Sequence, residues 1–316
     1  MTWYFPFICL GIGALLGLIK LTNKVVKIID YIGNIALLIL MLAIGINVGT
    51  DDVVIANIGI IGYQCVVISL LAMFSSIFFV FLLEKTILPL DKIKKKLSVD
   101  NMGMDEGLKI ETDKKRSPLV WIIPLCIIAG ILFGYFIINQ EHLFVVDKFF
   151  IVSLIVLYIT VGIGLTQNRG VFKYIKNLGV KIIFLPIAII IGSMVGGLIA
   201  GLIFDIPPHI SIISASGMSY YSITGAFMTQ TYGIHIGSYG FLVNVFRDFF
   251  TVLLLPLIIR IGKGAPIAAG ASSNMDTMLV PVTKFVGIEL GFIALIIGTI
   301  LTFTVPFLLP ILTQIF

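Results

Sequence analysis

Long runs of apolar residues dominate this chain and limit the folds open to it. Eight runs approach or exceed the roughly 18–20 residues that a helix needs to cross a bilayer, and only 12% of the residues are charged. A membrane β-barrel would instead alternate apolar and polar residues over about 10 positions. The sequence therefore predicts an all-α polytopic membrane protein with full spans at 3–19, 31–49, 57–83, 118–138, 149–166, 180–204, 238–259 and 287–312.

Two further segments, 208–232 and 265–285, are apolar only in parts and are interrupted by Gly, Ser, Asn and Pro. The loop 84–117 carries nine Lys and Arg residues, which predicts a cytoplasmic position. If each interrupted segment enters and leaves the membrane on the same side, 19 of the 21 basic residues are cytoplasmic. The exceptions are Lys148, which lies outside, and Arg247, which lies within a span. We therefore expect two re-entrant hairpins and both termini outside.

A weak internal repeat accompanies these spans. Residues 42–46 resemble residues 159–163 at an offset of 117, and the same offset pairs Gly62 with Gly179. The offset moves three spans along the chain, so the two copies would have opposite orientations, as in many secondary transporters. The predicted organisation is a three-helix scaffold repeat at 1–83, a charged linker at 84–117, an inverted repeat at 118–205 and a transport core at 206–316.

The first interrupted segment contains the polar stretch Ser-Ala-Ser-Gly-Met-Ser-Tyr-Tyr-Ser-Ile-Thr-Gly at 214–225. Non-helical backbone at membrane depth is tolerated only where it is buried in protein or lines a watery cavity. Its free backbone groups can then bind ligands, although small residues also permit close helix crossings. The candidate binding residues are Ser219, Tyr220, Tyr221, Ser222 and Thr224, with Gly217 and Gly225 as bend positions.

The second interrupted segment carries a carboxylate, Asp276, in the stretch 272–277. A charged side chain at membrane depth is costly, which makes it a functional candidate. Asp276 is suited to attract a cationic substrate or to carry a coupling proton; the alternative is a hairpin cap near the membrane interface. Its candidate neighbours are Ser272, Ser273 and Asn274, with Gly270 as a bend position.

Polar residues also occur inside and at the end of full spans. Asn244, Arg247 and Asp248 share a helix face by their spacing, whereas adjacent residues such as Arg247 and Asp248 do not face each other. This group either binds substrate or bridges the hairpins. Asp51 and Asp52 end the second span on the outer side, as site residues or as a solvated turn.

Other classes of function lack support in the sequence. There is no nucleotide-binding loop or dinucleotide fingerprint, and the three cysteines have neither metal nor redox spacing. Since no nucleophile–base pair stands out, an enzyme is not expected. In a membrane protein, the basic residues behind the net charge of +5 mainly set the orientation of the chain across the membrane, so this charge does not indicate a nucleic-acid partner. The sequence thus predicts no cofactor and no metal.

Three ordered motifs resemble the bacterial lysine exporter family LysO: the stretch 214–225, Asn-x-x-Arg-Asp with the following Leu-Pro-Leu-Ile, and Gly-Ala-Ser-Ser-Asn-Met-Asp-Thr. The resemblance implies export of L-lysine and analogues such as thialysine across the inner membrane, eight spans and both termini outside. It also implies two important acidic residues, at Asp276 and at Asp52 or its neighbour Asp51. The family commonly has an acidic residue where this chain has Asn244.

The resulting hypothesis is an exporter of lysine that exchanges it for protons or sodium ions. The resemblance also links the family distantly to cation–proton antiporters and bile-acid transporters, which move a core against a scaffold. In this hypothesis Asp276 binds the ammonium group, hairpin N–H groups and hydroxyls hold the carboxylate, and the helices before residue 205 form the scaffold and a homodimer surface. The alternative is a sodium-coupled carrier of small organic anions that uses Arg247.

Overall fold

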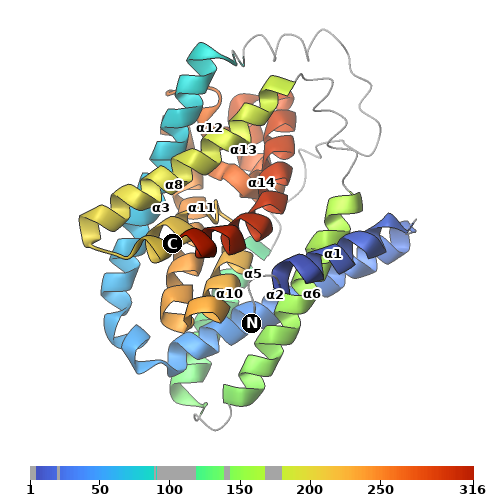
Figure 1. Ribbon diagram of the computed structural model, residues 1–316, viewed down its shortest axis with the longest axis vertical. Coiled ribbons are helices and arrows are strands. Elements are labelled where there is room, and N and C mark those ends of the chain that lie inside the picture. The colour runs from blue at the N-terminus through green and yellow to red at the C-terminus, as the bar shows by residue number, and fades with distance from the viewer. Residues whose placement is uncertain (1–4, 20–21, 89, 91–118, 139–142, 168–179) are drawn as a thin grey trace.

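A computed structural model describes residues 5–19, 22–88, 90, 119–138, 143–167 and 180–316, and this part of the chain contains helices and no strand (Figure 1). Six helices are long and apolar enough to cross a membrane, and two shorter apolar helices accompany them. The elements are α1 (Phe5–Leu18), α2 (Asn23–Thr50), α3 (Asp52–Thr86), α5 (Leu119–Phe136), α6 (Leu143–Gln167), η3 (Val180–Ile183), α8 (Phe184–Phe204), α9 (Pro208–Ala215), α10 (Tyr221–Tyr232), α11 (Ile234–Ile258), α12 (Ala265–Gly270), η4 (Ala271–Met275), α13 (Leu279–Val286) and α14 (Ile288–Ile315).

Several helices extend beyond the apolar runs that predict them. α2 begins at Asn23 rather than at residue 31, and its added turns carry the exposed side chains of Lys24 and Lys27. Polar residues continue a helix where their side chains reach water, so the apolar run marks only the membrane-facing part of each helix. Most of the predicted linker 84–117 lies outside the described residues.

Four helices, α1, α2, α5 and α6, form one packed group that we call the four-helix layer. α1 packs on α6, and α2 packs on both α5 and α6 (Figure 1). Glycines set these contacts: a Cβ built on Gly130 of α5 would lie 2.6 Å from the Leu42 carbonyl oxygen and 3.0 Å from the Gly45 Cα. Small residues let membrane helices approach this closely, since no side chain separates the backbones.

The remaining helices, α3 and α8 to α14, form a second group that we call the interrupted core. α3 packs along α8 and against α11 and α12, while α8 also packs on α9 (Figure 1). In this group α10 packs on α11, and α14 packs on η4 and α13. α3 and α8 therefore contact the broken helices directly and separate part of them from the lipid.

Both segments predicted to be interrupted contain a break between short helices. The first break separates α9 from α10, and the second is formed by η4 and the turn that leads to α13. Met218, Ser219 and Ala271 have positive φ angles of 49°, 73° and 46°, at the two breaks. Such a conformation costs about 1–3 kcal/mol in a non-glycine residue and is concentrated at functional sites. The strained backbone thus falls where the sequence predicts binding groups.

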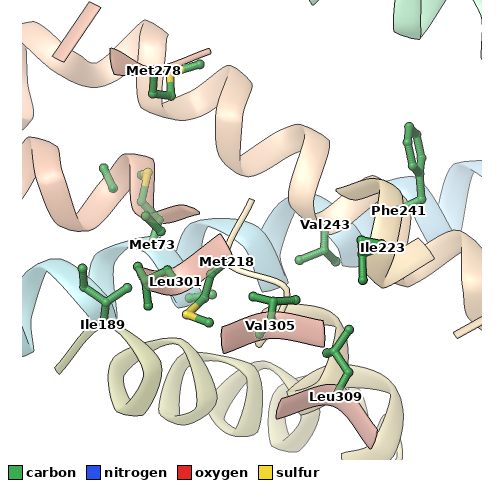
Figure 2. Close-up of a cluster of buried hydrophobic side chains, with 14 of the residues drawn as sticks. Met73, Ile189, Met218, Ile223, Phe241, Val243, Met278, Leu301, Val305 and Leu309 are labelled. Carbon is green, nitrogen blue, oxygen red and sulfur yellow. The ribbon is translucent and has the colours of Figure 1, made fainter. Parts of the chain in front are cut away.

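The two breaks cross each other inside the interrupted core. The backbone N–H of Ser272 donates to the Met218 carbonyl oxygen at 3.1 Å, and the Ser272 hydroxyl donates to the same oxygen at 2.6 Å. Figure 2 shows the Met218 side chain beside Leu301 and Val305 of α14, with Ile189 of α8 nearby. This apolar packing holds the strained backbone at Met218 in place.

Candidate functional site

Two carboxylates lie beside the second break. Asp248, on α11, accepts a hydrogen bond from the Ser273 hydroxyl at 2.8 Å, and that hydroxyl also contacts the Gly270 carbonyl oxygen at 2.7 Å. Asp248 and Asp276 lie within electrostatic range of each other. Asp248 is half-buried and Asp276 is exposed, so Asp276 is the more accessible of the two carboxylates.

Two tyrosines from the first break adjoin this acidic pair. Tyr220 lies within electrostatic range of Asp276, and Tyr221 lies within range of Asp276, Asp248 and Tyr220. Both side chains are half-buried, and the Tyr221 ring meets Phe241 edge to face at 5.8 Å. The structure thus brings together acidic groups from α11 and the second break with aromatic hydroxyls from the first.

Asn244 joins the two ends of the first break. Its side-chain oxygen accepts the Ser219 backbone N–H at 2.8 Å, and its amide nitrogen donates to the carbonyl oxygens of Ser214 at 2.9 Å and Gly240 at 2.7 Å. The residue is fully buried. A Cβ at Gly217 would lie 2.5 Å from this amide nitrogen, which explains the glycine there. Asn244 therefore positions the first break and has no donor directed at the acidic pair.

Arg247 serves the second break in the same way. Its guanidinium donates to the carbonyl oxygens of Ala269 at 3.2 Å and Ala268 at 3.0 Å, at the end of α12. It also donates to the hydroxyls of Ser193 at 2.8 Å and Ser76 at 3.2 Å, at the α3–α8 crossing. Arg247 is 1% exposed. Its hydrogen bonds go to neutral oxygens, so this cation connects α12 to the helices around it.

Among the other polar residues predicted for the site, some side chains bond to nearby backbone carbonyl oxygens and others do not. The Thr224 hydroxyl donates to the Tyr220 carbonyl oxygen at 2.8 Å, and the Asn274 amide nitrogen donates to Ile267 at 2.7 Å. The Ser219 hydroxyl lies near the Asp248 carboxylate, whereas the Asn274 side-chain oxygen is buried without a hydrogen-bond partner in the described part of the chain. Of the remaining candidates, Ser222 is buried beside the first break, Gly225 packs against Phe241, and Gly270 packs against the Asn274 amide.

The paired aspartates Asp51 and Asp52 lie at the corner between α2 and α3. Asp51 is half-buried at the end of α2, and α3 begins at Asp52, whose side chain lies outside the described part of the chain. This corner stands on neither interrupted segment. The contacts described for the acidic pair do not include Asp51.

Three residues of this region escaped the sequence-based prediction. Ser76 and Ser193 bind each other at 2.9 Å and hold Arg247, and the Thr302 hydroxyl donates to the Ser272 carbonyl oxygen at 3.1 Å. A signal for the two serines does exist, because they stand 117 residues apart, which is the offset of the internal repeat. Thr302 lies in an uninterrupted apolar run and has no comparable signal.

The chemistry of the site favours a small organic cation. Two carboxylates supply negative charge, nearby tyrosine and serine hydroxyl oxygens can accept hydrogen bonds from an ammonium group, and the tyrosine rings offer it aromatic faces. Within the described ranges, no three His, Cys, Asp or Glu side chains cluster as metal ligands would. An all-helical membrane protein whose broken helices bring such groups together belongs to the class of membrane transporters.

The comparison with protein families identifies the family of this chain. The family model described as "Lysine exporter LysO" matches residues 124–313, so the chain belongs to the LysO lysine exporter family. The matched region includes both interrupted segments and the acidic pair.

Two curated proteins are similar to parts of the chain. The "Lysine exporter LysO" of Escherichia coli (strain K12) is 30% identical over 157 residues, which cover 50% of this chain and 52% of that protein. The "Putative lysine exporter" of Haemophilus influenzae (strain ATCC 51907 / DSM 11121 / KW20 / Rd) is 25% identical over 183 residues, covering 58% and 92% respectively. The chain thus matches about half the length of the first relative. No solved structure matches it.

Proposed function

We propose that this protein is a secondary active transporter that exports L-lysine and cationic analogues such as thialysine across the cytoplasmic membrane. The observation that carries the proposal is the acidic pair Asp248 and Asp276 beside Tyr220 and Tyr221, at the crossing of two broken helices. The carboxylates would hold an ammonium group of the substrate. The family and the relative named as a lysine exporter support the same substrate.

Export of a cation requires a coupling ion. Moving one positive charge outward against an inside-negative potential costs about 2.3 kcal/mol per 100 mV. We propose exchange with protons, or alternatively with sodium ions. Asp276 would carry the coupling ion in the absence of substrate, because its side chain is the more exposed of the two carboxylates.

The geometry supports a cation carrier over the organic-anion alternative. An anion site would need Arg247 as a free cation, but its guanidinium is buried and already donates to four protein oxygens. Binding an anion there would break these contacts. The accessible charged groups of the site are Asp248 and Asp276, which would repel an anionic substrate.

We also propose that the chain crosses the membrane eight times, with both termini outside and the interrupted segments entering from opposite sides. The positive-inside count supports this orientation. The helices of 1–83 and 118–205 would be inverted repeats around the binding core 206–316. Equivalent contacts support the repeat, because Gly13 contacts Gly162 and Gly130 contacts Gly45. Gly130 follows Gly13 by 117 positions, and Gly45 precedes Gly162 by the same 117.

A second inverted pair within the core is part of the same proposal. An offset of 54 relates Met218 to Ser272, which bond to each other at the crossing. The same offset relates Gly233 to Gly287, whose φ angles are 89° and 92°, and each of these glycines precedes a long helix. Elements related by a two-fold axis meet near that axis, so equivalent residues contact each other there.

Flux measurements on purified protein in proteoliposomes test the proposed function. Labelled lysine would be followed under a pH gradient and, separately, under a sodium gradient. We expect gradient-driven lysine flux in wild type and its loss in Asp276→Asn, with Asp205→Asn, at the α8 end, as a control carboxylate outside the site. Absence of lysine flux in correctly inserted wild type would overturn the proposal, and labelled organic anions would then test the alternative.

Pairing of two copies is the last element of the proposal. α1 and α2 of the four-helix layer expose large apolar side chains, including Leu15 and Ile28, and such a face can contact either lipid or a second copy. Native mass spectrometry from detergent is expected to show a homodimer. A monomer over the whole detergent range would contradict this element and leave the transport proposal intact.

A further inference from the structure

Tyr158, in the middle of α6, is a polar residue that no part of the site described so far uses. Its side chain is 0% exposed, and its hydroxyl is buried without a hydrogen-bond partner within the described ranges. Buried hydroxyls almost always have a partner, so an unpartnered one calls for an explanation. Phenylalanine would fill the same apolar space without this cost, so packing alone does not account for tyrosine here.

The surroundings of Tyr158 connect it to the acidic pair. Its side chain lies within electrostatic range of Tyr220, at the first break, and of Cys9 of α1. Tyr220 in turn lies within range of Asp276. The same region of α6 adjoins α14, where a Cβ at Gly164 would lie 3.8 Å from the Phe303 ring. Tyr158 therefore stands where the four-helix layer meets the interrupted core.

We propose that Tyr158 is a substrate-binding residue contributed by the four-helix layer, and that its hydroxyl donates to the carboxylate of the transported amino acid. The proposal rests on the proposed function. Asp248 and Asp276 supply acceptors for an ammonium group but repel a carboxylate, so the other end of an amino acid needs donors away from them. The Tyr158 hydroxyl meets this need, because it lies near Tyr220, neither aspartate is among its electrostatic neighbours, and it lacks a protein hydrogen-bond partner within the described ranges.

This assignment predicts which ligands depend on Tyr158. Lysine has a carboxylate, whereas cadaverine carries the same amine-bearing chain without it. We expect Tyr158→Phe to weaken lysine binding about three- to tenfold, the size of one hydrogen bond, and to leave cadaverine binding unchanged. Tyr31→Phe, on the exposed face of α2, is the matched control and is expected to change neither affinity.

Binding of both ligands to the purified full-length protein is measured by calorimetry, with lysine flux recorded in parallel. Unchanged lysine affinity in folded Tyr158→Phe would overturn the inference, as would equal losses for lysine and cadaverine, which indicate packing. If wild type neither binds nor transports lysine, the proposed function fails as well. If wild type does both and Tyr158→Phe behaves as Tyr31→Phe does, only this inference fails.

A second measurement keeps the tyrosine in place and does not depend on the variant folding. 3-Fluorotyrosine is incorporated at position 158 alone, and its fluorine resonance is recorded with and without lysine. We expect a lysine-dependent shift that saturates at the concentration that saturates flux, and no shift with cadaverine. An unmoved resonance at saturating lysine, in protein that transports lysine, would contradict the assignment.

Discussion

The four-helix layer and the interrupted core are both apolar and helical, but they are held together in different ways. In the four-helix layer, backbones touch at glycines, as Gly130 does at Leu42 and Gly45. In the interrupted core, buried side chains of α11 bond to the broken backbone, as Asn244 does at Ser214 and Ser219. Whole helices can pack mainly through such close contacts because their backbone groups are already paired, and the polar bonds of this layer lie near helix ends, as between Gln167 and Gly17. Broken helices need partners for their free backbone groups.

This difference indicates how a membrane protein can hold a polar site. The residues that repair the breaks, Asn244 and Arg247, occupy fixed bonds and leave Asp248 and Asp276 open. The fold therefore separates the polar groups that stabilise the breaks from those that can bind a ligand. Four predictions test this separation, in order of decreasing expected effect.

The largest effect is expected at Arg247. Arg247→Met removes the guanidinium that donates to two carbonyl oxygens of α12 and to two serine hydroxyls. Each buried polar group left without a partner costs about 1–3 kcal/mol of stability. We expect the free energy of unfolding to fall by about 3–5 kcal/mol, measured by thermal or denaturant unfolding in detergent. Arg247→Lys, with fewer and differently directed donors, should lie in between. A fully stable Arg247→Met would show that the core does not depend on these bonds.

Asn244 provides the same test at the first break. Asn244→Leu leaves the Ser219 N–H without its acceptor and removes one of the two donors to the Ser214 carbonyl oxygen, which predicts a loss of about 2–4 kcal/mol in unfolding free energy. Thr299→Val is the control, since the Thr299 hydroxyl bonds only within its own helix. Chemical denaturation of both variants in one detergent compares them. Equal stabilities would mean that the first break needs no side-chain partner.

A close glycine contact tests the four-helix layer. Gly130→Ala places a Cβ 2.6 Å from a backbone oxygen that cannot rotate away, so we expect a loss of about 1–3 kcal/mol from overpacking. Gly11→Ala, with open space around the added Cβ, is expected to be neutral or slightly stabilising. The melting temperatures of the two variants, each compared with that of wild type, measure this difference in stability. If both alanines are tolerated alike, close backbone contact does not hold this layer.

The smallest effect is expected at the edge of the core, where the Glu84 carboxylate of α3 accepts the Gly264 backbone N–H at 3.1 Å. Glu84→Ala removes this half-buried contact and should cost about 0.5–1.5 kcal/mol, while Glu84→Gln keeps an acceptor oxygen and should cost less. Hydrogen exchange of the Gly264 amide reports the contact directly. Exchange that is equally slow in Glu84→Ala would exclude a role for this carboxylate.

Much of this architecture follows from local features of the sequence. Continuous apolar runs predicted membrane helices, and polar residues with glycine predicted breaks within 208–232 and 265–285, where α9 ends before α10 and α12 before α13. Asp276 and Asp248 stood out because charged residues are rare at membrane depth. These predictions depend only on neighbouring residues, because helix formation and membrane insertion respond to the composition of a short window.

Only the tertiary structure decided which polar groups bond to the protein itself and which remain available to a ligand. Arg247 reaches the Ser76 hydroxyl across 171 residues, so its bonds to neutral oxygens cannot be read from its helix. Tyr158 looks like any aromatic residue in an apolar run until packing sets it beside Tyr220. Helix crossings bring together residues that are distant in the chain, and the composition of each helix says little about which neighbour it will meet.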